Sequence, residues 1–186
     1  MGRGPLAGPV VAAAVVLPRS GWPEGVRDSK RLSPKARERL AAAIRDCAQI
    51  GLGAVEADEI DRLNIHRATL EAMRRAVAAL PIRPAHLLVD GRFPPAVGCP
   101  TTAVIRGDAR SLCVAAASIV AKVARDAIMA AHAEAHPHYG WRTNQGYPTP
   151  EHRAALIRHG ATALHRRSFA PVAQAIEKAG NTFAEG

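Results

Sequence analysis

The stretch LLVDGRFPPAVGCPTTAVIRGDAR, residues 87–110, is the most informative part of this 186-residue chain about its fold class. Two short apolar runs, 86–90 and 101–105, have the length and composition of strands. Longer segments on either side, 58–80 and 111–135, repeat apolar residues at helical spacing. Strands interspersed with helices predict an α/β domain whose sheet is covered by helices on its faces.

Further elements follow outward from this stretch. The apolar run Val10–Leu17 is bounded by prolines and is typical of a buried strand. Ser33 and Pro34 indicate a helix start, because the serine can accept an unpaired backbone N–H and proline at the first helical position loses no hydrogen bond. We therefore expect strands at 10–17 and 49–55 and helices at 35–47 and 151–159, the last closed by Gly160.

Composition limits the class of protein. Hydrophobic residues make up 48% and charged residues 22% of the chain, which is enough for one buried core and argues against bulk disorder. No apolar run approaches the roughly 20 residues that span a bilayer, and the first residues lack a signal-peptide pattern. We expect a cytoplasmic protein without membrane contact. The three cysteines are odd in number and widely spaced, which predicts reduced thiols.

The formal net charge of +9 favours a polyanionic partner such as nucleic acid. Against this background, two carboxylates at strand ends suggest chemistry. Asp90 ends one expected strand, and Asp108 follows the next; in open α/β sheets ligands bind beyond such ends. Asp90 could instead only start a turn with Gly91, and Asp108 could only open a helix. Because Mg²⁺ prefers oxygen ligands and assists phosphodiester hydrolysis, a two-metal nuclease is one hypothesis.

Three other segments are candidates for substrate contacts. Gly2 and Gly4 offer no side chain, so the backbone amides of this segment could approach a sugar-phosphate closely, with Arg3 available for a phosphate; a flexible terminus would also explain the three residues. Lys30 precedes a helix, where it could contact a phosphate or be a solvated surface charge. Tyr147 lies in a loop flanked by glycine and proline, where it could stack on a base or sugar or pack in the core.

Taken together and in order, these pieces resemble bacterial ribonuclease HII. The likeness extends to Val172 and rests on eight ordered blocks, which are more specific together than any one alone. The blocks are GRGPLAGPVVAAAV (2–15), DSKRLSPKAR (28–37), EIDRLNI (59–65), LLVDG (87–91), GDARSL (107–112), AAASIVAKVARD (115–126), GYPT (146–149) and HRRSFAPV (165–172).

The resemblance implies a ribonuclease H-like mixed sheet flanked by helices over residues 1–172, including a helical C-terminal part. Beyond it, we expect a loosely ordered tail at 173–186, since chain ends are often poorly held. It implies hydrolysis of RNA in RNA–DNA hybrids and cleavage on the 5′ side of ribonucleotides embedded in duplex DNA, with Mg²⁺ or Mn²⁺, leaving a 3′-hydroxyl and a 5′-phosphate. It also implies a role in replication and ribonucleotide excision repair. The family mostly works as a monomer, and contact with a sliding clamp stays open.

The resemblance also implies residue roles. Asp90 and Asp108 match the third and fourth acidic residues of the family's metal site. The motif of Gly2, Arg3 and Gly4 matches the segment that reads the 2′-hydroxyl at the RNA-to-DNA junction. Tyr147 matches the tyrosine that packs on the neighbouring sugar, and Lys30 matches a phosphate contact.

The sequence departs from the family pattern at its start. The family's first two acidic residues, an Asp-Glu pair, precede the Gly-Arg-Gly motif by one residue, and this sequence begins at that intervening position. The first central strand, which carries the pair, is accordingly expected to be missing. We expect the 186-residue chain to be inactive or nearly so, and a start assigned too late at an internal methionine would account for the difference.

Two other functions stay open on the sequence. A non-catalytic binder of hybrid or junction-bearing nucleic acid would keep the Gly-Arg-Gly contact without the chemistry. A basic RNA-associated protein without hybrid preference would bind hybrid and plain RNA equally. An in-frame Asp-Glu pair in the codons upstream of Met1 would favour the enzyme, and a stop codon close upstream would favour the binder.

Overall fold

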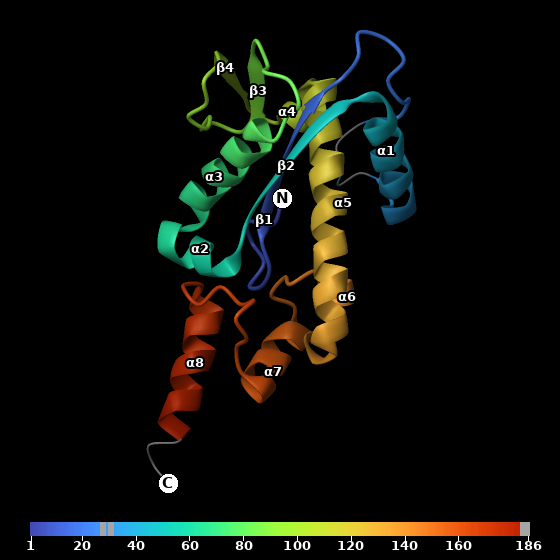
Figure 1. Cartoon of the computed structure of the whole chain (residues 1–186). Helices are drawn as coiled ribbons and strands as arrows, with labels where there is room; N and C mark the ends of the chain where they lie inside the picture. Colours follow the sequence, from blue (N-terminus) through green and yellow to red (C-terminus); the bar gives the residue numbers. More distant parts are fainter. Residues whose placement is uncertain (27–28, 30–31, 183–186) are drawn as a thin grey trace. The chain divides into compact units, whose positions relative to one another are not determined.

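The computed structural model describes residues 1–26, 29 and 32–182. No helix within these residues is both long and apolar enough to cross a membrane. The elements, in chain order, are β1 (Val10–Val16), α1 (Pro34–Cys47), β2 (Gln49–Val55), α2 (Ala57–Leu63), α3 (Ile65–Ala78), β3 (Leu87–Asp90), β4 (Thr101–Val104), α4 (Gly107–Arg110), α5 (Leu112–Ala135), the 3-10 turn η2 (Pro137–Tyr139), α6 (Trp141–Asn144), α7 (Pro150–His159) and α8 (Ala170–Thr182) (Figure 1).

The chain forms two compact units. The first comprises Met1, Val11–Ala54 and Thr69–Ala124, and the second comprises Gly2–Val10, Val55–Ala68 and the chain from Arg125 onward. The strands form two pairs, β1 with β2 and β3 with β4. Helix α5 contributes residues to both units.

A hydrophobic core in the first unit joins α1 and the first half of α5 to the pair β1–β2. Its fully buried members include Ile44 of α1 and Ile119 of α5, and Ala13 and Ile50 pack against it from the strands. Helix α1 starts as the sequence predicts, with the Ser33 hydroxyl accepting the N–H of Ala36. Apolar residues at helical spacing therefore cover one face of this strand pair.

Two glycines let α3 approach β2 very closely. A Cβ at Gly51 would lie 2.0 Å from the carbonyl oxygen of Ala76, and one at Gly53 would lie 2.2 Å from that of Ala72. On the helix side, the residues at this contact are the small alanines Ala72 and Ala76, and both are buried. The absence of side chains at both strand positions sets the distance between strand and helix.

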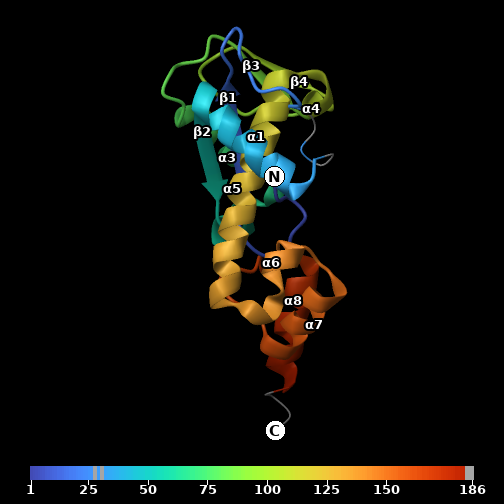
Figure 2. The ribbon, with the colours of Figure 1, turned by 90° about the vertical axis from the view of Figure 1, so that its right-hand side faces the viewer.

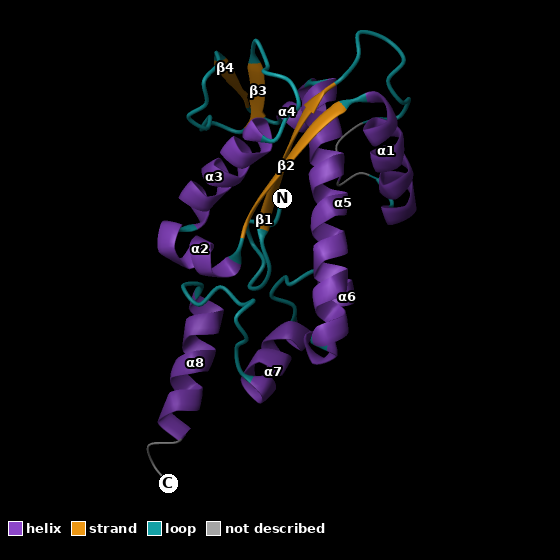
Figure 3. Cartoon of the chain, in the orientation of Figure 1, coloured by secondary structure: helices purple, strands orange, loops and turns teal. Residues whose placement is uncertain are grey.

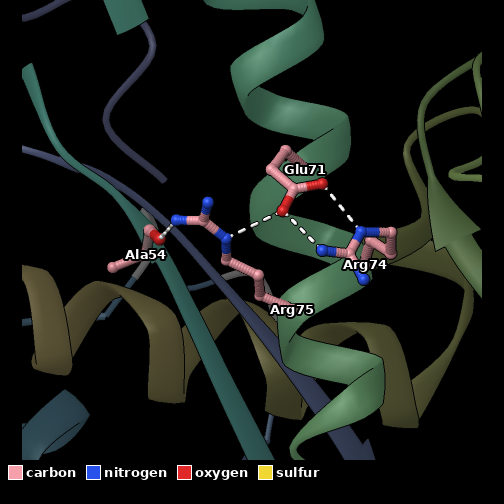
Figure 4. A network of polar contacts seen from close by, with 4 residues as sticks. All are labelled: Ala54, Glu71, Arg74 and Arg75. Carbon is pink, nitrogen blue, oxygen red and sulfur yellow. Dashed lines mark hydrogen bonds and ion pairs between the residues drawn. The ribbon is translucent and has the colours of Figure 1, made fainter. Parts of the chain in front are cut away.

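A hydrogen bond, supported by ion pairs within α3, links the same helix to the strand. The Glu71 carboxylate binds the guanidinium groups of Arg74 and Arg75, and Arg75 donates through Nη1 to the carbonyl oxygen of Ala54 at 2.8 Å (Figure 4). Hydrogen bonding to Arg74 is the largest cause that holds the pKa of Glu71 at about 2, against an ordinary 4.5. The carboxylate thus orients Arg75 toward the end of β2.

The second strand pair is small and parallel. Strands β3 and β4 pair in register from Leu87 opposite Thr101 to Asp90 opposite Val104. Val89 is buried, whereas Asp90 at the strand's end is exposed. Both strands therefore end at the same edge. After β4 the chain continues into the short helix α4.

The second unit is built largely from helices and loops, as the colouring of Figure 3 shows for the chain from Arg125 onward. Helices α7 and α8 lie side by side (Figure 2). Leu6, Leu156 and Val172 form one buried cluster, and Met129, Tyr139 and Trp141 belong to another. Leu6 thus anchors the N-terminal segment in this core.

Most of the expected elements are present, but one helix is interrupted. The sequence predicts a single helix over 58–80, which is wrong, because Asn64 separates α2 from α3 with φ of 66°. Its side-chain Oδ1 accepts the N–H groups of His66 and Arg67 and so caps the start of α3. Asparagine tolerates the left-handed region and competes for backbone N–H groups, which explains the break.

Residues from Ala170 to Thr182 form α8; the loose order expected of the tail stays a prediction.

Candidate functional site

The two candidate metal ligands lie in the first unit, at the shared edge of β3 and β4. The Oδ1 atom of Asp90 accepts the backbone N–H of Gly107 at 2.8 Å. Gly107 is buried, and a Cβ there would lie 3.1 Å from Val114 and 3.4 Å from the Asp90 backbone. The hydrogen bond therefore fixes the start of α4 against the end of β3. Because Asp108 directly follows Gly107, the structure brings Asp108 and Asp90 to the same edge.

Carboxylate oxygens are the donors that Mg²⁺ and Mn²⁺ take from proteins. The described residues contain no cluster of three or more His, Cys, Asp or Glu side chains able to hold a metal ion. By the chemistry of their donor atoms alone, Asp90 and Asp108 fit a divalent cation.

The N-terminal segment 2–9 belongs to the second unit, where Arg166 holds it through its backbone. The guanidinium donates to the carbonyl oxygens of Gly2 (2.7 Å), Arg3 (3.2 Å) and Gly8 (2.8 and 3.0 Å). Arg166 has no exposed surface. One buried side chain thus ties together both ends of the turn that contains the Gly-Arg-Gly motif.

A second buried arginine, Arg125 of α5, supports the same segment from the other side. It donates to the carbonyl oxygens of Pro9, Ala7 and Gln145 at 3.0–3.1 Å. A Cβ at Gly2 would lie 2.1 Å from its Nε atom, and Gly2 has φ of 83°. Both the close approach and the positive φ require glycine at this position.

Burial governs the electrostatics of this arginine pair. It lowers the pKa of Arg166 to about 9, and the positive charge of Arg125 adds to the effect. Burial likewise lowers the pKa of Arg125. Asp61 acts in the opposite direction on Arg166, while its carboxylate accepts the N–H groups of Arg167 and Ser168. The carbonyl oxygens that ring the guanidinium groups replace the water lost on burial.

Tyr147 lies beside the Gly-Arg-Gly motif. A Cβ at Gly4 would lie 3.6 Å from its ring atom Cε1, and the tyrosine is 43% exposed. The N–H of Leu6 donates to the Gly146 carbonyl at 2.7 Å, so the two loops run together. Gly146 has φ of 79°, and a Cβ there would meet the Ala7 carbonyl at 2.7 Å. An exposed aromatic ring and exposed backbone thus form one surface.

Buried histidines hold the Tyr147 loop from inside. Trp141 donates its indole N–H to Nε2 of His152 at 3.0 Å, so this ring carries its proton on Nδ1 and donates to the Tyr147 carbonyl at 2.9 Å. His165 contacts the same Nε2 at 3.2 Å, and its own Nδ1 accepts the N–H of Thr162. Burial lowers the pKa of both histidines, that of His165 to about 3. Both rings are therefore neutral near pH 7.

The structure thus sorts the candidate residues into two sets. Gly2, Arg3, Gly4 and Tyr147 lie in the second unit, and Asp90 and Asp108 lie at one strand edge in the first. Lys30 lies outside the described residues.

The candidate residues can now be compared with known protein families. The sequence profile described as Ribonuclease HII matches residues 1–172, which include all six of these positions. The chain belongs to the ribonuclease HII family. Ribonuclease HII of Parvibaculum lavamentivorans is 57% identical over 172 residues, covering 92% of this chain and 64% of that protein. The chain thus spans slightly less than two thirds of this relative's length.

Solved structures agree on the fold. The crystal structure of ribonuclease H2 from Pyrococcus horikoshii OT3 matches with a TM-score of 0.82 at 26% identity, covering 96% of this chain and 94% of the other. That of Bst-RNase HIII in complex with Mn²⁺ matches with a TM-score of 0.79 at 20% identity, covering 97% and 68%. The expected α/β, ribonuclease H-like fold is confirmed, and family membership places the chain among ribonuclease H hydrolases.

Sequence reasoning missed the buried side chains that hold the ribonuclease HII motif, namely Arg125, Arg166 and His152. Arg125 had a weak signal: Ala121 and Met129, four residues to either side on α5, are apolar, which puts the arginine on a buried face. Arg166 lies within the block HRRSFAPV, where nothing local distinguishes it from Arg167. Only the fold separates the buried arginine from its exposed neighbour.

Proposed function

We propose that this chain is a metal-dependent endoribonuclease that acts on RNA in RNA–DNA hybrids and on the 5′ side of ribonucleotides in duplex DNA. The products would carry a 3′-hydroxyl and a 5′-phosphate. The observation that carries the proposal is the match to ribonuclease HII over residues 1–172. The adjacent exposed positions of Gly4 and Tyr147 support it. Cytoplasmic action as a monomer in ribonucleotide repair and replication is part of this proposal.

Recognition of the ribose would fall to the second unit. The 2′-hydroxyl is the only group that separates a ribonucleotide's sugar from that of DNA, so a selective site needs donors or acceptors close to the sugar. The backbone of Gly2, Arg3 and Gly4 would supply them, and the ring of Tyr147 would pack on the adjacent sugar. The Arg3 side chain, and Lys30 beyond the described residues, would contact phosphates and set the register.

Asp90 and Asp108 would hold Mg²⁺ or Mn²⁺. A bound divalent cation supplies Lewis-acid stabilisation of the negative charge that develops at a scissile phosphate and lowers the pKa of a bound water. The role of this chain's own residues is to fix the carboxylates. Two observations support this role: the Gly107 N–H donates to Asp90, and Asp108 follows Gly107 in the first turn of α4.

The direct test is cleavage of a DNA duplex that contains one ribonucleotide, in Mg²⁺ or Mn²⁺, with product ends assigned on sequencing gels. We expect cleavage on the 5′ side of the ribonucleotide, and binding that prefers the ribonucleotide duplex over all-DNA duplex. The Parvibaculum ribonuclease HII is the positive control.

Absence of cleavage in both Mg²⁺ and Mn²⁺ would contradict the proposed endoribonuclease activity. Equal affinity for ribonucleotide-bearing and all-DNA duplexes would contradict the proposed function itself. Among the described residues, no group of three or more His, Cys, Asp or Glu side chains could hold a metal ion, and this favours one alternative, a non-catalytic binder of hybrid or junction-bearing nucleic acid. Ribonucleotide preference with no cleavage under any metal condition would identify it.

A further inference from the structure

The contacts of Arg166 determine which way two successive peptide groups of the Gly-Arg-Gly motif face. The Gly2 carbonyl accepts from Nη2 at 2.7 Å, and the Arg3 carbonyl accepts from Nη1 at 3.2 Å. No cis peptide bond occurs among the described residues. In a trans peptide group the C=O and the N–H point in opposite directions. The N–H groups of Arg3 and Gly4 therefore both face away from the guanidinium.

This orientation directs the two N–H groups toward solvent. Arg3 and Gly4 are exposed, while Gly2 and Arg166 are buried. In the described part of the chain, the backbone N–H groups of Arg3 and Gly4 have no acceptor among the backbone hydrogen bonds of turns and loops. Successive N–H groups that face one way form a concave donor site for an oxygen ligand. This pair lies beside the exposed Tyr147 ring.

We propose that Arg166 is a positioning residue for ribose recognition: by binding the carbonyl oxygens of Gly2 and Arg3, it presents the N–H groups of Arg3 and Gly4 to the 2′-hydroxyl of the substrate. The inference rests on the proposed function and deepens it. Arg166 itself, fully buried, does not touch the nucleic acid.

The chemistry of the side chain explains why an arginine stands here. Its planar fork reaches three different carbonyl oxygens at once, with Nε and Nη2 on Gly8 and Nη2 and Nη1 on Gly2 and Arg3. A lysine carries three donors on one rotating nitrogen and cannot hold carbonyl groups that lie along the edge of a rigid plane. Replacement by lysine should therefore free the Gly2–Gly4 backbone while keeping a positive charge.

The experiment compares the wild-type chain with Arg166→Lys and Arg166→Met in binding to two duplexes, one all-DNA and one with a single ribonucleotide. The readout is the ratio of the two dissociation constants, which does not require cleavage. We expect the ratio to fall about tenfold in both variants, the effect of losing two ordinary hydrogen bonds, while affinity for all-DNA duplex changes less than twofold.

Tyr139→Phe is the matched control for destabilisation alone. It removes a buried hydrogen bond in the same unit, from the tyrosine hydroxyl to the Gly160 carbonyl at 2.7 Å, and leaves Gly2 and Arg3 untouched. This variant should keep the wild-type ratio. A folded Arg166→Lys variant with an unchanged ratio would overturn the proposal, whereas a wild-type ratio of one would overturn the proposed function as well.

A measurement on the wild-type chain covers the case in which neither Arg166 variant folds. In ¹H–¹⁵N spectra, the ribonucleotide duplex should shift the amide resonances of Arg3 and Gly4 downfield relative to the all-DNA duplex, because each N–H gains an acceptor. Identical shifts with the two duplexes would exclude these amides as the ribose contact and overturn the inference.

Discussion

Arg166 and Arg167 are neighbours in sequence with opposite roles. Arg166 is fully buried and binds carbonyl oxygens, while Arg167 is exposed and its backbone N–H donates to Asp61. A buried guanidinium is costly unless its donors are satisfied, and here four hydrogen bonds to carbonyl oxygens do so. Charge counted along the sequence therefore overstates the cations available to nucleic acid, since Arg125 and Arg166 do not reach the surface.

Asp90 offers the sharpest single-residue test of the proposed metal site. In Asp90→Asn the side-chain oxygen can still accept the Gly107 N–H, so the fold should keep its stability within about 0.5 kcal/mol, while the charge that attracts a cation is lost. We expect affinity for Mn²⁺, measured by calorimetry or electron paramagnetic resonance, to fall at least tenfold. Asp46→Asn, an exposed residue of α1, is the control. Undiminished Mn²⁺ affinity in Asp90→Asn would remove Asp90 from the site.

At the scale of elements, local signals located most helices and strands. Ser33 and Pro34 mark the start of α1, and Gly160 follows the end of α7, as predicted. The sequence pattern did not predict the break at Asn64, because apolar residues continue at helical spacing across it. The helical period of apolar residues alone therefore does not reveal the interruption. The capping bonds to His66 and Arg67 become visible only in three dimensions.

The approach of α3 to β2 predicts a strong effect of one methyl group. In Gly53→Ala the new Cβ would lie 2.2 Å from the Ala72 carbonyl and 2.5 Å from the Ala76 nitrogen. Backbone must move, so we expect a loss of about 2–3 kcal/mol in the free energy of unfolding measured by urea titration. Gly98→Ala is the matched control, because its Cβ would meet only the end of the Arg83 side chain at 3.3 Å. Equal losses in the two variants would contradict the close packing.

At the scale of the whole molecule, the buried histidines predict how stability depends on pH. The pKa of His165 is about 3 in the folded chain against an ordinary 6.5, because burial disfavours the imidazolium. The unfolded chain therefore binds more protons between these values. The contribution of His165 is fully present above pH 6.5 and is lost as the pH falls toward 3.

We accordingly expect the free energy of unfolding to decrease from pH 6.5 to 5 with a slope of up to about 1.4 kcal/mol per pH unit from this residue. His165→Asn, whose side-chain oxygen can replace Nδ1 as the acceptor for Thr162, should show a smaller slope between urea titrations at pH 7, 6 and 5. His86→Asn, at an exposed residue, should retain the wild-type slope. A wild-type slope in His165→Asn would show that His165 is not the cause.

The sequence by itself determined the alternation of strands and helices, the basic charge, and the identity of the motif residues Gly2–Gly4, Asp90, Asp108 and Tyr147. These are properties of short segments, in which period, caps and ordered blocks can be read directly. Only the tertiary structure decided which arginines are buried, which way the Gly-Arg-Gly peptides face, and that Gly4 lies beside Tyr147. The physical reason is that Arg166 binds Gly2 across more than 160 residues of chain, and contacts between such distant residues leave no local pattern in the sequence.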